Sequence, residues 1–139
     1  MRERLADKTV LLTGGARGMG AVHARVMAEE GARVLVTDLL DEQGETLAAQ
    51  LRGEGRDVTY RHLDVTDPHA WAGAVAFASQ ELGGLHVLVN NAGIQSFEDA
   101  PNETLEMYER TIAVNQTSCF LGMKYAIPAM REQGGGAIV

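Results

Sequence analysis

One glycine-rich stretch has residue types and spacing suited to a turn that holds a charged ligand. In TGGARGMG, residues 13–20, Gly14, Gly18 and Gly20 follow the pattern G-x-x-x-G-x-G directly before helix-forming residues. Glycine lets the backbone turn sharply and come close to a ligand, because it has no Cβ atom. Free N–H groups at the start of the helix would favour a pyrophosphate. A tight strand-to-helix turn without a ligand could use the same glycines, so both interpretations stay open.

An acidic residue follows the next apolar run at a distance that fits nucleotide binding. Asp38 ends RVLVTD and lies 24 residues after Gly14. At about this offset a carboxylate accepts hydrogen bonds from an adenosine ribose. A carboxylate there repels the 2′-phosphate of NADP and Leu39 adds no positive charge, so NAD is favoured over NADP. Arg17 is the one residue that could pair with a 2′-phosphate, and a helix N-cap is the ligand-free alternative for Asp38.

Two further apolar runs end in polar residues. The run before LDV ends at Asp64, whose carboxylate could accept from an adenine amino group while Val65 offers its backbone N–H. A capping role for Asp64 is an equal alternative. The next run ends in NNAG, residues 90–93, where adjacent asparagines would be costly to bury without partners. We expect them to bond backbone groups of neighbouring strand ends, and Gly93 to permit close approach of a ribose.

The chain resembles the short-chain dehydrogenase/reductase family in five features taken together: TGGARGMG, Asp38, LDV, NNAG and VNQT. Within that family it looks most like the hydroxysteroid dehydrogenase and 3-oxoacyl-carrier-protein reductase branch. The resemblance implies an NAD(P)-dependent oxidoreductase that interconverts a hydroxyl and a carbonyl group on a small-molecule alcohol or ketone by hydride transfer. It assigns these residues to the cofactor: Gly14, Arg17, Gly18, Met19 and Gly20 at the pyrophosphate, Asp38 beside Leu39 at the ribose, Asp64 and Val65 at adenine, and Asn91, Ala92 and Gly93 at the adenosine and the nicotinamide side.

The resemblance also concerns the catalytic residues. Asn115, in VNQT, matches the family's asparagine that positions a water in the proton relay, although a mid-helix asparagine at a kink is the alternative. Gln116 and Ser118 depart from the family's commoner leucine and glycine. The family's catalytic serine, tyrosine and lysine follow later, and no tyrosine here has a lysine four positions on. We therefore expect the N-terminal part of a longer enzyme, truncated within strand five and inactive alone.

Short apolar runs alternate with helical patterns and must position these residues. Strands are expected at 8–14, 33–38, 57–65, 85–93 and from 137, and helices at 20–32, 41–55, 67–84 and 102–131, with Pro128 bending or ending the last. Such alternation predicts parallel strands with right-handed crossovers. We expect an α/β, doubly wound Rossmann sheet of order 3-2-1-4-5, with its ligand site between strands 1 and 4 at their carboxyl ends.

Composition sets further limits on function. The chain has 139 residues, 45% hydrophobic and 22% charged, which predicts one globular domain, an incomplete NAD(P)-binding unit over 1–139. The net charge of −7 argues against a nucleic-acid partner. We expect no membrane segment and no metal site, because no apolar run is long enough and the histidines are scattered. A single cysteine, Cys119, and a charged start favour the cytoplasm.

Other functions are compatible with the same residues. A non-catalytic nucleotide-binding protein, or an inactive cofactor-binding fragment, would use the same strand ends without a catalytic tyrosine. A methyltransferase also has a parallel sheet with an acid after its second strand, but the glycine spacing and NNAG favour the first two. The family resemblance further implies a homo-oligomer, in which the long helix carrying Tyr108, Ile112, Phe120 and Met123 helps to form a subunit interface.

Overall fold

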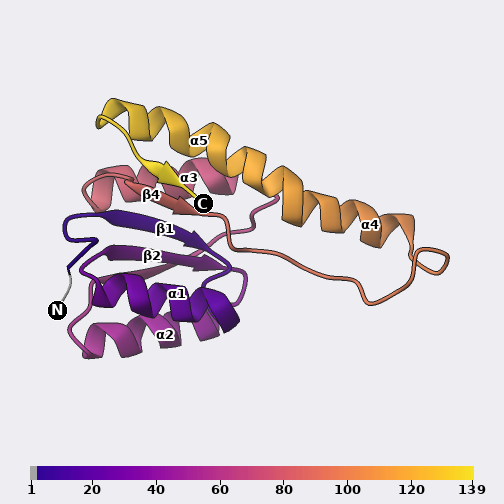
Figure 1. Ribbon diagram of the computed structural model, residues 1–139, viewed down its shortest axis with the longest axis horizontal. Helices are drawn as coiled ribbons and strands as arrows, with labels where there is room; N and C mark the ends of the chain where they lie inside the picture. The colour runs from indigo at the N-terminus through magenta and orange to yellow at the C-terminus, as the bar shows by residue number, and fades with distance from the viewer. Residues whose placement is uncertain (1–2) are drawn as a thin grey trace.

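The computed structural model describes residues 3–139 as a five-stranded parallel sheet with helices on both faces (Figure 1). The sheet order is β3-β2-β1-β4-β5, which confirms the predicted doubly wound topology. The strands are β1 (Thr9–Thr13), β2 (Arg33–Asp38), β3 (Val58–His62), β4 (Val87–Val89) and β5 (Ala137–Ile138). The helices are α1 (Gly18–Glu29), α2 (Asp41–Gly53), α3 (Pro68–Glu81), α4 (Leu105–Ile112), the π-helical turn η1 (Ala113–Thr117) and α5 (Ser118–Glu132).

Each face of the sheet has its own apolar core, because successive side chains of a strand point to opposite faces. Val10 and Leu12 of β1 pack with Ala24 of α1 and Ala48 of α2. Leu11, between them, packs on the other face with residues of α3 and α5. Figure 1 shows α1 and α2 together on one side of the sheet and α3 and α5 on the other. Burial on both faces explains why the strands are almost continuously apolar.

Local signals place α3 as the sequence predicts. The Asp67 carboxylate accepts from the His69 N–H, and Pro68 occupies the first helical position, where its missing N–H costs nothing. Trp71 of this helix is fully buried, and its indole N–H donates to the Val65 carbonyl at 2.8 Å. The helix thus fixes the loop after β3.

The long helical segment after β4 differs in part from expectation. Pro128 lies inside α5, which continues to Glu132, so of the two predicted effects, a bend or an end of the helix, the end does not occur. A proline removes one backbone hydrogen bond. Here Ala126 and Met130 are buried against the sheet on either side of it, and this packing keeps the last turn helical. The π-helical turn between α4 and α5 was not predicted.

Candidate functional site

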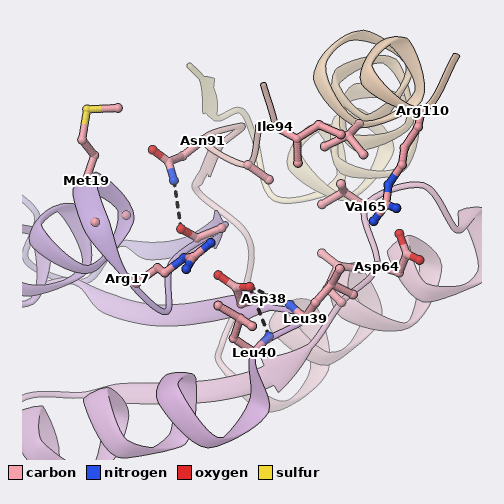
Figure 2. A pocket seen from close by; sticks show the side chains of 17 residues that line it. Arg17, Met19, Asp38, Leu39, Leu40, Asp64, Val65, Asn91, Ile94 and Arg110 are labelled. Atoms are coloured by element: carbon pink, nitrogen blue, oxygen red, sulfur yellow. Dashed lines mark hydrogen bonds between the residues drawn. The ribbon is translucent and has the colours of Figure 1, made fainter. Parts of the chain in front are cut away.

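A pocket of about 390 Å³ lies where the carboxyl ends of β1, β2 and β4 meet the loop after β3 (Figure 2). The twelve residues that the resemblance assigned to a cofactor all line it: Gly14, Arg17, Gly18, Met19, Gly20, Asp38, Leu39, Asp64, Val65, Asn91, Ala92 and Gly93. The sheet therefore brings four separate segments of the sequence to one cavity. That they bind a cofactor remains a prediction.

The glycine loop takes a conformation that other residues would resist. Gly14 and Gly18 have φ angles of +63° and +57°, in the left-handed region. A Cβ atom at Gly20 would lie 2.0 Å from the Gly14 carbonyl oxygen. Helix α1 begins at Gly18, two residues earlier than expected, and Arg17 supplies no side-chain cap. The first N–H groups of α1 are thus left uncapped at the pocket, where an anion could accept from them.

The asparagine after β4 holds this loop in place. The Asn91 side-chain N–H₂ donates to the carbonyls of Thr13 and Gly14, both at 3.0 Å. The backbone N–H groups of Asn91 and Ala92 donate to the Thr13 hydroxyl at 3.1 and 3.0 Å. These bonds confirm the expectation that Asn91 would satisfy a neighbouring strand end. They also explain why β4 ends at Val89 rather than continuing through NNAG.

The Asp38 carboxylate is already partly engaged with the backbone. Its Oδ2 accepts from the Ala16 N–H of the glycine loop at 3.0 Å. Its Oδ1 accepts from the N–H groups of Leu39 and Leu40 at 2.7 and 3.2 Å. A carboxylate offers about four acceptor positions, so roughly one stays free for a ligand hydroxyl. Helix α2 has Leu40 at its N-cap position and no side-chain cap, so the alternative of Asp38 as a helix N-cap is wrong. Asp38 instead holds the turn before α2 and keeps an acceptor position open at the pocket.

Asp64 also caps the chain locally. Its Oδ1 accepts from the hydroxyl and the N–H of Thr66 at 2.7 and 2.9 Å. These bonds, the hydroxyl first, hold the pKa of Asp64 below its ordinary value, and His62 and Arg110 contribute positive charge. The carboxylate is thus kept ionised, and it remains an acceptor at the pocket wall.

Asn115 does not line the pocket but supports a residue that does. Its side-chain Oδ1 accepts from the Ile94 N–H and its Nδ2 donates to the Ile94 carbonyl, each at 2.8 Å. Ile94 follows NNAG and faces the cavity. Asn115 lies in the π-helical turn η1, at the point where the alternative interpretation placed a kink in the helix. Its catalytic role stays a prediction.

Five lining residues were missed from the sequence: Leu40, Leu63, Ile94, Arg110 and Val114. Arg110 and Val114 are four positions apart on adjoining helical turns, and this spacing places them on one face. Figure 2 shows Arg110 pointing from α4 toward Asp64. The spacing in the sequence predicts that Arg110 and Val114 share one helical face, but only the fold shows that this face lies over the pocket.

Comparison with known proteins decides the family. A model of the short chain dehydrogenase family matches residues 8–139. The chain belongs to the short chain dehydrogenase family. Its sheet order and glycine loop are therefore those of a member of that family.

Individual short chain dehydrogenases resemble the chain over almost all of its length. It is 46% identical to a trans-4-hydroxycyclohexanecarboxylate dehydrogenase of Sinomonas cyclohexanicum, over 98% of this chain and 55% of that protein. It is 47% identical to a 3-alpha-(or 20-beta)-hydroxysteroid dehydrogenase of Mycobacterium tuberculosis, over 100% of this chain and 52% of that protein. The crystal structure of gox2181 superposes with a TM-score of 0.93 at 30% identity, over 99% of this chain and 54% of that one. The chain spans about half the length of these relatives.

Within residues 3–139, no group of three or more His, Cys, Asp or Glu side chains could hold a metal ion. Among the helices of the same residues, none combines the length and the apolar character needed to cross a membrane.

Proposed function

We propose that this chain is the NAD(P)-binding part of an oxidoreductase that interconverts a hydroxyl and a carbonyl group on a small alcohol or ketone. One observation carries the proposal. The uncapped start of α1, the glycine loop and the carboxylates of Asp38 and Asp64 line a single pocket, at the carboxyl ends of the strands where the sheet order reverses between β1 and β4. The dehydrogenases among the relatives support the same class of reaction.

The glycine loop fits a dinucleotide on steric grounds. An added Cβ at Gly14 would lie 2.8 Å from the Ala92 Cα, so the loop and the NNAG segment approach more closely than other residues allow. The uncapped N–H groups of α1 would bind the pyrophosphate, Asp38 the adenosine ribose and Asp64 the adenine amino group. A bound nicotinamide cofactor supplies the hydride acceptor or donor. Asn115, through Ile94, would hold the wall of the pocket.

We further propose that NAD is preferred over NADP. Asp38 carries a negative charge at the predicted ribose position and its neighbours Leu39 and Leu40 are apolar. A 2′-phosphate would lie close to the Asp38 carboxylate, and the repulsion between two negative charges is strongest at short distance. Arg17, in the glycine loop, lies at the same pocket and could offset the repulsion.

Hydride transfer by this chain alone is proposed to be negligible. The Tyr60 hydroxyl bonds the Asp38 carbonyl and the Asp41 carboxylate, Tyr108 is exposed on α4, and Tyr125 is half-buried on α5. No tyrosine among residues 3–139 has a lysine four positions later. This supports the second candidate, an inactive nucleotide-binding fragment, for the 139 residues taken by themselves. The mass of the protein isolated from its own cell distinguishes the inactive fragment from the complete oxidoreductase. A mass of about 14.9 kDa favours the fragment, and a much larger mass favours the enzyme.

Calorimetric titration of the chain with NAD, NADP and S-adenosylmethionine tests the binding proposal. We expect NAD to bind more tightly than NADP, and Asp38→Asn to narrow that preference by removing the charge that repels the 2′-phosphate. Gln43→Ala, on the exposed surface of α2, serves as the control and should leave both affinities unchanged. Binding of S-adenosylmethionine alone would overturn the dehydrogenase proposal in favour of a methyltransferase.

We also propose that the protein associates with a second copy of itself through α4 and α5. Leu105, Tyr108, Phe120 and Met123 are exposed there, and Phe120 is 57% exposed. Figure 1 shows α4 extending beyond the sheet, so that few other elements can cover it. Burial of these side chains against a second copy would remove apolar surface from water.

A further inference from the structure

The hydroxyl of Tyr60, on β3, lies between two acceptors at the turn that follows β2. It is 2.9 Å from the Asp38 carbonyl oxygen and 2.7 Å from the Asp41 Oδ1. The Nδ1 of His62 lies 2.8 Å from the same carboxylate oxygen. None of Tyr60, Asp41 and His62 lines the pocket, so the proposed function leaves this cluster unexplained.

The position of the Tyr60 ring is fixed by packing against α2. A Cβ atom at Gly44 would lie 2.1 Å from the ring Cε2, so only glycine leaves room for the ring at this point. Burial, and then the hydrogen bond to Asp41, raise the pKa of Tyr60 well above its ordinary value. The hydroxyl therefore keeps its proton throughout the neutral range and remains a donor to the turn.

The turn from Asp38 to Asp41 is thus held from two sides. On the β1 side, the Ala16 N–H donates to the Asp38 carboxylate. On the β3 side, the Tyr60 hydroxyl contacts the Asp38 carbonyl and the Asp41 carboxylate. About one acceptor position of the Asp38 carboxylate stays free. The direction in which this free position points depends on how precisely the turn is held.

We propose that Tyr60 is a positioning residue for the ribose subsite. Its hydroxyl, with Asp41 as partner, holds the turn so that the free acceptor position of Asp38 faces the adenosine ribose. The inference rests on the proposed function, since it requires a nucleotide at this site. It assigns no contact between Tyr60 and the ligand.

Tyr60→Phe tests the inference because it removes one oxygen and leaves the ring against Gly44. We expect the Kd for NAD to rise about three- to tenfold, as the loss of one hydrogen-bond donor implies. Tyr125→Phe is the matched control, because the Tyr125 hydroxyl has no hydrogen bond within residues 3–139, and it should not change the Kd. Gly44→Ala, which displaces the ring, should weaken NAD binding as Tyr60→Phe does.

A double-mutant cycle with Asp38→Asn separates positioning from general stabilisation. If Tyr60 acts through Asp38, Tyr60→Phe should change the Kd for NAD less than twofold in the Asp38→Asn background. Equal effects in both backgrounds, or an unchanged Kd in the single variant, would overturn the inference while leaving the proposed function intact. Absence of NAD binding by the unaltered chain would overturn both.

Discussion

Gly18 and Gly20 lie two residues apart at the start of α1, but an added methyl group would meet different surroundings at each. At Gly18 the φ angle is +57° and nothing lies within 4 Å of the added Cβ. At Gly20 the Cβ would lie 2.0 Å from the Gly14 carbonyl oxygen and 2.8 Å from the Asn91 Nδ2. The first glycine is thus required by conformation alone, and the second by close approach of two backbone segments.

We expect Gly18→Ala to cost about 1 kcal/mol of unfolding free energy, through left-handed strain. Gly20→Ala should cost about 3 kcal/mol and abolish NAD binding, because the loop must move to admit the methyl group. Urea unfolding followed by the fluorescence of Trp71, the one tryptophan of the chain, measures both losses. Equal costs would show that the contact around Gly20 is relieved by a small shift.

The bonds from Thr66 to Asp64 predict a dependence of stability on pH. They lower the pKa of Asp64, so their contribution is present above the ordinary aspartate value of about 3.9 and is lost as pH falls through the folded-state pKa. We expect Thr66→Ala to lower the Tm at pH 7 and this difference to shrink as pH falls below about 4. Thr66→Ser keeps the hydroxyl and should follow the unaltered chain. A Tm difference that is constant from pH 7 to pH 2 would contradict the assignment.

At the scale of elements, η1 ties the loop after β4 to the long helical segment. Asn115 makes both of its side-chain hydrogen bonds with the backbone of Ile94. We expect Asn115→Ala to lower the unfolding free energy by about 1 kcal/mol, since the site is exposed and water replaces part of each bond. The amide hydrogen of Ile94 should also exchange faster with solvent.

Gln116→Ala is the matched control, because Gln116 is exposed in the same turn and its side chain makes no hydrogen bond within the described residues. It should change neither the free energy nor the exchange rate. Unaltered exchange at Ile94 in Asn115→Ala would mean that the loop is held by other contacts.

At the scale of the whole molecule, the exposed apolar face of α4 and α5 should govern self-association. We expect the chain to associate increasingly with concentration in sedimentation velocity, and Phe120→Glu to reduce this without lowering the Tm. Val22→Glu is the control, because Val22 is 58% exposed on α1, across the sheet from α5. A chain that stays monomeric, or equal effects of both substitutions, would contradict an interface on α4 and α5.

Much of the fold could be predicted from the sequence because its signals are local. Apolar runs between glycine and aspartate turns indicated the strands, Asp67 and Pro68 marked the start of α3, and parallel crossovers limited the sheet order. The residues at the ends of β1, β2 and β4 could be named for the same reason, because carboxyl ends of parallel strands meet at one edge. Of the bend or end expected at Pro128, the end does not occur, because burial of α5 outweighs one missing hydrogen bond.

The alternation of elements, the glycine loop and the carboxylate after β2 could be predicted without the fold, since each depends on neighbours along the chain. Three arrangements depend on the fold: Arg110 points toward Asp64, Asn115 holds Ile94, and Tyr60 contacts the turn at Asp38. These pairs lie 21 to 46 positions apart in the sequence, and their side chains have no distinguishing local pattern. Their partners are set by how the strands and helices pack, which no short stretch of sequence specifies.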